Sequence, residues 1–130
     1  MECPDCGSDT LAFAVPDQYH DALPGDEGGV ALCTHCLSMH PAPDVSGDPP
    51  DFQQVSDAFP SDGDAALPMA LVVGLLSNLA LYRSEISDLL TAVERAGTDP
   101  LLVLDRLDHD PDIDPATDLA GRRRHLEQLL

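Results

Sequence analysis

The residues of this chain best suited to chemistry are its cysteines, which occur as two CxxC pairs. Cys3 and Cys6 lie in CPDCG, and Cys33 and Cys36 lie in CTHCL; no other cysteine occurs in the 130 residues. Two cysteines three positions apart on a tight turn can bind the same ion, and two such pairs supply the four thiolates of a tetrahedral site. The spacing therefore predicts one metal centre made by all four cysteines.

Four thiolates on one divalent ion leave no position for water or substrate, so the centre is expected to be structural rather than catalytic. Metal binding then contributes directly to folding, by about 10 kcal/mol or more. We expect one Zn²⁺ per chain, with Fe as the alternative because iron accepts the same four-thiolate geometry. His35 and His40 lie close to the second pair. They are interpreted as exposed neighbours rather than ligands.

Free buried thiols or redox dithiols are the other interpretation of the cysteine pairs. A thioredoxin-like CxxC would open a helix after a buried strand within a larger α/β fold, and CPDCG at residues 3–7 has no such setting.

Short strands must position the pairs. TLAFAV at 10–15 alternates larger and small residues, which indicates a half-buried strand, and GVALC at 29–33 would deliver Cys33 as a second strand. The intervening segment is rich in Pro, Gly and Asp, which is typical of a long connection. A third strand near 37–45 is restricted to a sheet edge because it contains Pro41 and Pro43.

CPDCG and CTHCL resemble the two knuckles of a zinc ribbon, in which such turns at strand ends close a Cys₄ site. The resemblance implies that residues 1–47 form a zinc-ribbon-like metal-binding module. Gly7 follows the first pair and permits the left-handed conformation that such a turn needs. Leu37 stands at the equivalent position of the second pair, where the pattern usually has Gly or another small residue.

Residues 48–130 are expected to form a helical domain. Phe52, Val55 and Phe59 share one face of a short helix that could cover the β module. A long central helix is predicted at about 65–96, with Asp62 or Asp64 as its N-cap. Its apolar residues follow a seven-residue repeat at Val72, Leu75, Leu79, Tyr82, Ile86, Leu89, Val93 and Ala96.

Two further helices are predicted from Asp-Pro start signals. Asp99 and Pro100 can begin one helix, and Asp114 and Pro115 can begin the last. The fold class expected is α+β, with a small zinc-ribbon β module followed by an all-α bundle of three main helices.

The charge balance limits the possible partners. The chain has 24 acidic residues, 19 of them Asp, against 6 Arg and no Lys, for a formal net charge of -18. This composition resembles that of proteins from extreme halophiles. Nucleic-acid binding is disfavoured, because a chain this acidic lacks the counterion release that usually drives it.

The search for other motifs points away from catalysis. No GxSxG, HExxH, P-loop or GxGxxG is present, so an enzyme is not expected. The acidic stretch at 108–114 is interpreted as an interhelix loop rather than a calcium loop, because it lacks the central Gly and final Glu of an EF-hand. The basic cluster Arg122–Arg124 is interpreted as surface partners of nearby acids, with a phosphate-binding patch as the alternative.

The longest apolar run, 67–82, is shorter than the roughly 20 residues that span a bilayer. No membrane association is expected, and the protein is expected to be cytoplasmic. In that reducing compartment paired cysteines are metal ligands more often than disulfides.

The order CPDCG, CTHCL, SDAFP, ERAG, TDPLLVLDRL and RRRHLEQLL resembles a family of small uncharacterised haloarchaeal proteins with an N-terminal zinc ribbon. That resemblance implies metal ligands at the four cysteines and no assigned activity. We therefore expect a non-enzymatic zinc protein that contacts an unknown protein partner, with a homodimer through the 72–96 stripe as one form. Packing of that stripe within one chain is the competing interpretation. A nucleic-acid-associated zinc ribbon is the alternative function, and rubredoxin-like electron transfer is a more distant one.

Overall fold

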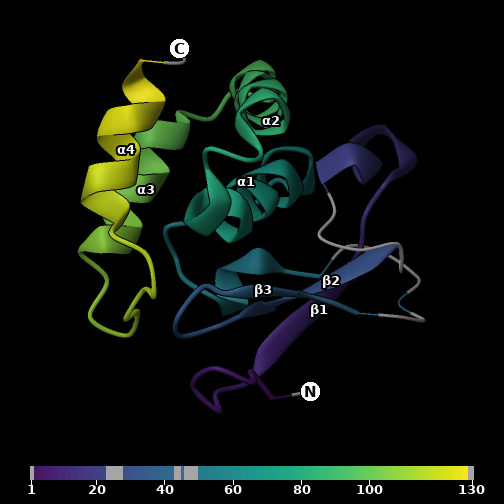
Figure 1. Ribbon diagram of the computed structural model, residues 1–130, viewed down its shortest axis with the longest axis vertical. Coiled ribbons are helices and arrows are strands. Elements are labelled where there is room, and N and C mark those ends of the chain that lie inside the picture. The colour runs from purple at the N-terminus through teal and green to yellow at the C-terminus, as the bar shows by residue number, and fades with distance from the viewer. Residues whose placement is uncertain (1, 23–27, 43–44, 46–49, 129–130) are drawn as a thin grey trace.

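A computed structural model describes residues 2–22, 28–42, 45 and 50–128 of the chain. Within this part, three strands form one antiparallel sheet in the order β1 (Thr10–Ala14), β2 (Gly29–Cys33) and β3 (Met39–Pro41). A 3-10 helix, η1 (Asp17–Ala22), follows β1. The first two strands occur at the predicted segments, and β3, which is shorter than the predicted 37–45, lies at an edge (Figure 1).

Four α-helices follow in the described residues, so the protein is a mixed α+β structure. They are α1 (Gly63–Leu75), α2 (Arg83–Arg95), α3 (Pro100–Asp108) and α4 (Leu119–Glu127). Two short 3-10 helices, η2 (Phe52–Gln54) and η3 (Leu76–Asn78), precede and follow α1. Figure 1 shows α1 between the sheet and α2, with α3 and α4 packed side by side at one flank.

The prediction of one long helix at 65–96 is wrong. The helix ends at Leu75, passes through η3 and restarts at Arg83, so that α2 folds back against α1. Ser77 and Asn78, which are poor helix formers, lie at this break. α1 is buried almost all round, so it needs packing partners on more than one side. The sheet covers one side of α1. Because the chain folds back after α1, α2 covers the side away from the sheet (Figure 1).

Most of the seven-residue stripe is buried within the chain, as its competing interpretation proposed, while Tyr82 and Ala96 are half-buried. Its members Val72, Leu75, Ile86, Leu89 and Val93 are all buried among other residues of the same chain.

Two other predicted helices differ from the structure. The last helix starts at Leu119 with Asp118 as its N-cap, not at Asp114, because the chain from Asp110 to Pro115 is used as a loop. The helix expected to contain Phe52, Val55 and Phe59 is only the turn η2 followed by irregular chain. The bundle consequently has four α-helices in the described residues rather than three.

The other start signals are confirmed. Asp99 accepts hydrogen bonds from the amides of Leu101 and Leu102, with Pro100 in the first turn of α3. Asp62 is the N-cap of α1, where it accepts a hydrogen bond from the amide of Asp64.

One hydrophobic cluster joins the sheet to the helices. Phe13 and Leu32 of the sheet and Leu71 of α1 belong to it. Phe13 also contacts Phe52 edge to face, with ring centroids 4.9 Å apart, so η2 covers the sheet as the sequence predicted. The predicted domain boundary between residues 47 and 48 lies outside the described residues.

Gly74 allows α1 to approach the sheet closely. A Cβ added there would lie 2.6 Å from Cβ of Met39 on β3, which is too close for ordinary packing. We expect Gly74→Ala to lower the free energy of unfolding by about 1–3 kcal/mol through overpacking. Gly63→Ala is the matched control on the same helix, because a Cβ there meets nothing within 4 Å. Urea denaturation of both variants tests this, and equal stabilities would contradict it.

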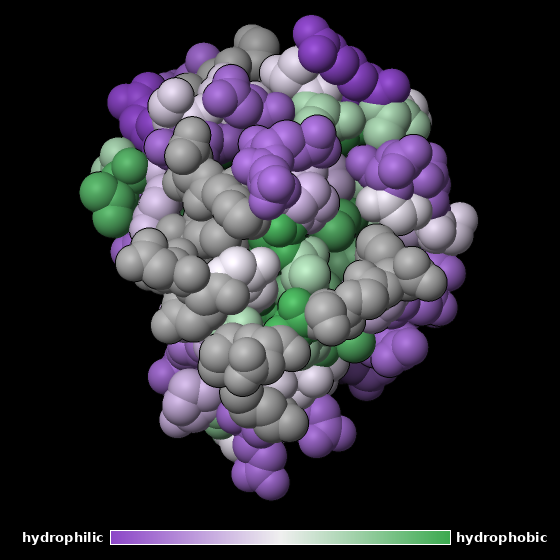
Figure 2. Space-filling view, turned by 90° about the vertical axis from the view of Figure 1, so that its right-hand side faces the viewer, coloured by the Kyte–Doolittle hydropathy of each residue, from purple (hydrophilic) through white to green (hydrophobic). Residues whose placement is uncertain are grey.

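The surface carries most of the charge, and Figure 2 shows hydrophilic residues mostly toward the edge of one face, with hydrophobic residues nearer its centre. Ion pairs among the described residues are few: Arg123 contacts Asp105 and Glu127, and Asp105 also contacts His109. His40 and Asp5 form another pair at 3.5 Å. None of the helices in the described chain is long and apolar enough to cross a membrane.

Candidate metal centre

The first cysteine pair lies on a tight turn just before β1. The amide of Cys3 donates to the carbonyl of Ser8 at 2.8 Å, and the amide of Gly7 donates to the carbonyl of Cys3 at 2.9 Å. Gly7 has φ of 79°, which a residue without Cβ adopts at little cost. The turn thereby directs both cysteines to one side.

The second pair repeats this turn at the end of β2. The amide of Cys33 donates to the carbonyl of Ser38 at 2.8 Å, as the amide of Cys3 does to Ser8. Leu37 has φ of 63° and is the one non-glycine residue with positive φ in the described chain. Although Leu replaces the usual Gly, the second knuckle thus has the left-handed residue at the same position as the first.

Backbone amides also point at the sulfur of Cys33. The amides of His35 and Cys36 donate to Cys33 Sγ at 3.4 and 3.3 Å. Such hydrogen bonds stabilise the thiolate form that binds metal. These two hydrogen bonds favour the thiolate, although burial outweighs them and raises the pKa of Cys33 overall.

Strand pairing brings the two knuckles together. Thr10 pairs with Cys33 in the β1–β2 ladder, and the amide of Thr34 donates to the carbonyl of Asp9 at 3.0 Å. As a result, the first turn lies beside the second even though a long connection separates them in sequence.

The four sulfurs converge on one point. Sγ atoms of Cys3 and Cys36 are 3.7 Å apart, those of Cys6 and Cys33 are 3.4 Å apart, and all four lie within 4.8 Å of one another. Zn–S bonds of about 2.3 Å in a tetrahedron place sulfurs about 3.8 Å apart. The donor set and its spacing fit a four-thiolate metal ion.

The four thiols differ in exposure and acidity. Cys3, Cys33 and Cys36 are buried, whereas Cys6 is exposed. Hydrogen bonds with Ser8 lower the pKa of Cys6 from 9.0 to about 6, while burial raises the pKa of Cys33 to about 12. Burial also raises the pKa of Cys36. The cluster therefore has one solvent-facing corner, at Cys6.

Two serines contribute to the centre that the motif search did not identify. Ser38 Oγ lies 3.1 Å from Cys36 Sγ, and Ser8 hydrogen-bonds with Cys6 through its side chain and backbone. Each serine lies two positions after the second cysteine of its pair, so both knuckles are CxxCxS. That repeated serine is the signal that would have indicated a hydroxyl beside a sulfur of each pair.

The loop between α3 and α4 supports the second knuckle. The amides of Asp114 and Ala116 donate to the carbonyls of His35 and Cys36 at 2.9 and 3.0 Å, and His35 Nδ1 lies 3.0 Å from the carbonyl of Asp112. The acidic stretch 108–114, interpreted from sequence as an interhelix loop, does connect α3 to α4. Its hydrogen bonds link the helices to the second knuckle. His35 is half-buried in this contact rather than exposed.

A second group of possible ligands shares Cys3. Asp5 and His40 could join Cys3 around an ion, but Cys3 already belongs to the four-sulfur cluster. The cluster of four sulfurs is the more complete donor set.

Comparison with known families now adds to this geometry. A model of a family of unknown function, DUF6276, matches residues 2–130. The chain belongs to this family. The match includes both knuckles and all four helices, so the DUF6276 sequence pattern extends over the whole described fold. No curated protein and no solved structure matches the chain.

Leu37 provides a test of the DUF6276 knuckle geometry. Leu37→Gly relieves a left-handed backbone worth about 1–2 kcal/mol, but it removes a side chain that is only 5% exposed. Loss of a buried Leu side chain costs about 2–5 kcal/mol. We therefore expect Leu37→Gly to lower the free energy of unfolding by about 1–3 kcal/mol, measured by urea denaturation. Gly7→Ala is the comparison in the first knuckle. It adds only the strain of a left-handed backbone, since a Cβ there meets nothing within 4 Å. A Leu37→Gly variant more stable than the parent chain would contradict this account.

Proposed function

We propose that Cys3, Cys6, Cys33 and Cys36 bind one Zn²⁺ ion in a structural Cys₄ site of zinc-ribbon type. The observation that carries this proposal is the convergence of four sulfurs from two equivalent knuckles. Three of the sulfurs are buried, and the ion they enclose would have no vacant position for a substrate. The zinc would link the N-terminal turn, the end of β2 and, through the second knuckle, the α3–α4 loop.

Elemental analysis and colour test the metal assignment. Protein purified without added metal should contain about one zinc per chain and be colourless. A red protein with about one iron per chain would show that the bound metal is iron in a rubredoxin-like centre, not zinc. Four thiols that react freely with a thiol reagent while one zinc remains bound would contradict ligation by cysteine, because bound thiolates react slowly.

We further propose that the protein is non-enzymatic and acts by contacting another protein. The closed ligand set supports this, because the centre most suited to chemistry would be saturated by its own cysteines. The formal net charge of -18 disfavours nucleic acid as the partner. Filter binding of RNA and DNA in molar KCl tests that preference. If the protein retains RNA or DNA on the filter in a saturable way, and Arg123→Ala loses this retention, the result would favour the nucleic-acid alternative.

A further inference from the structure

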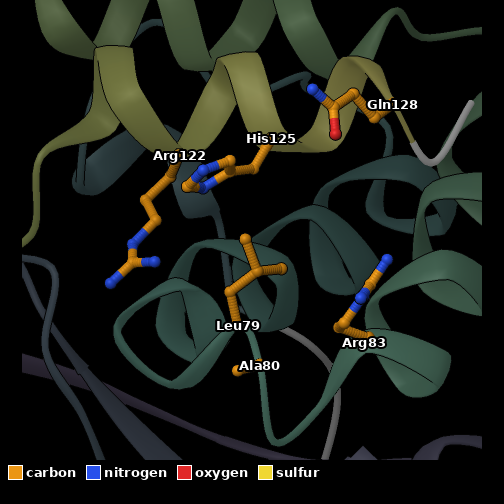
Figure 3. Close-up of a pocket in the computed structure, with 6 residues that line it drawn as sticks. All are labelled: Leu79, Ala80, Arg83, Arg122, His125 and Gln128. Atoms are coloured by element: carbon orange, nitrogen blue, oxygen red, sulfur yellow. The ribbon is translucent and has the colours of Figure 1, made fainter.

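A surface pocket lies where the α1–α2 connection meets α4. Its volume is about 230 Å³. Figure 3 shows the side chains that line it, which come from α4 and its C-cap, from the α1–α2 connection and from the first residue of α2: Arg122, His125, Gln128, Leu79, Ala80 and Arg83.

The pocket is basic on an otherwise acidic protein. Two of the chain's 6 arginines and one of its 5 histidines line it, and none of the lining residues is Asp or Glu. By contrast, 24 acidic residues occur in the chain. Two other pockets in the described part of the chain are also lined by an arginine, but each of them is lined by Asp as well. The pocket described here has cationic side chains and no carboxylate.

The three neighbouring arginines of α4 have different environments. Arg123 contacts Asp105 at 3.4 Å and Glu127 at 3.7 Å, which confirms the surface-partner interpretation for this residue. Arg122 lines the pocket, and neither it nor Arg83 forms an ion pair with a described residue. Unpaired guanidinium groups have their hydrogen-bond donors free for an external acceptor.

We propose that this pocket binds the phosphate group of a small molecule. A phosphate group carries more negative charge and more acceptor oxygens than a carboxylate, so it is the better match for a pocket with several cationic donors and no acidic side chain. A phosphate group has enough oxygens to accept hydrogen bonds from Arg83 on one side and from Arg122 on another. Leu79 and Ala80 give the pocket an apolar wall that could contact the organic part of a phosphate ester. This proposal does not depend on the metal centre.

Titration of ¹⁵N-labelled protein with inorganic phosphate, phenyl phosphate and acetate at constant ionic strength tests the proposal. We expect saturable shifts of the amide signals of Arg83, Arg122 and His125 with both phosphates, and weaker, non-saturating shifts with acetate. Tighter binding of phenyl phosphate identifies an organic phosphate as the ligand class, and equal binding identifies free phosphate. Non-saturating shifts with both phosphates, or acetate binding as tightly, would overturn the proposal.

Substitutions localise the binding. Arg122→Gln and Arg83→Gln should each weaken phosphate binding about tenfold or more, because each removes a charge-assisted hydrogen bond. Arg124→Gln is the matched control, since it removes the same charge two positions further along α4 but does not line the pocket. Two variants on different elements keep the test decisive if one fails to fold. Equal weakening by Arg124→Gln would show general charge attraction and overturn the site.

Discussion

Replacing Cys6 by serine should release the metal and lower the free energy of unfolding by several kcal/mol. Cys6 is exposed, so the substitution removes almost no packing, and the loss would report metal coordination alone. Structural zinc contributes about 10–16 kcal/mol to small zinc domains, whereas whole domains are stable by only about 5–15 kcal/mol. The sheet is small and has one three-residue strand, so we expect it to depend strongly on the proposed metal link. Elemental analysis and urea denaturation provide the measurements.

Asp5→Asn is the matched control for that experiment. Because Asp5 also pairs with His40 and belongs to the second group of possible ligands, the comparison separates that group from the four-sulfur cluster: Asp5→Asn should keep the metal if the four cysteines alone bind it. Cys33→Ser should resemble Cys6→Ser in metal content, although it also disturbs a fully buried position. A strong chelator should destabilise the parent chain and leave Cys6→Ser unchanged. If Cys6→Ser kept one zinc and the parent stability, the Cys₄ assignment would be wrong.

Metal loss should also be detected away from the sheet. The amides of Asp114 and Ala116 donate to the second knuckle, so a disordered knuckle no longer protects them. Hydrogen exchange at these two amides should accelerate in Cys6→Ser, while exchange at amides in the middle of α1 changes less. This pattern would locate the effect of the metal in the α3–α4 loop.

Local patterns in the sequence predicted local structure well. The Asp-Pro start of α3, the N-cap of α1 and the alternating strands around the knuckles depend on neighbouring residues, which a sequence displays directly. The edge position of β3 followed from Pro41 in the same way. For the candidate centre, cysteine spacing alone indicated which four residues would meet.

Long-range packing accounts for what the sequence did not predict. The seven-residue repeat continues from α1 into α2 because each helix needs an apolar face. One long helix and two helices folded together therefore show the same repeat in the sequence. Likewise, nothing near Asp114 shows that its amide will bind the carbonyl of His35, a contact between distant parts of the chain. That contact is why the last helix begins later than its Asp-Pro signal.

Raising KCl from 0.1 M to 2 M should raise the melting temperature by about 5 °C or more. Two carboxylates about 8 Å apart in water repel by about 0.5 kcal/mol, and the formal net charge of -18 leaves many such pairs. Few carboxylates are neutralised by ion pairs among the described residues. Near 1 M salt the Debye length falls to about 3 Å, which removes most of this repulsion. Thermal melts at matched pH, with metal content checked at each salt concentration, test the expectation.

Two kinds of acidic residue should respond oppositely, and this separates charge repulsion from a general effect of salt. Neutralising the exposed residues Asp57, Asp88 and Glu94, which form no ion pair with a described residue, should raise stability at 0.1 M KCl and reduce the salt dependence. Asp99→Ala removes an N-cap and should cost about 1 kcal/mol at either salt concentration, because a capping hydrogen bond is short-ranged. Equal melting temperatures at both salt concentrations in the parent chain would refute the dominance of repulsion. A neutralised triple variant with the parent's full salt response would show that salt acts through apolar burial instead.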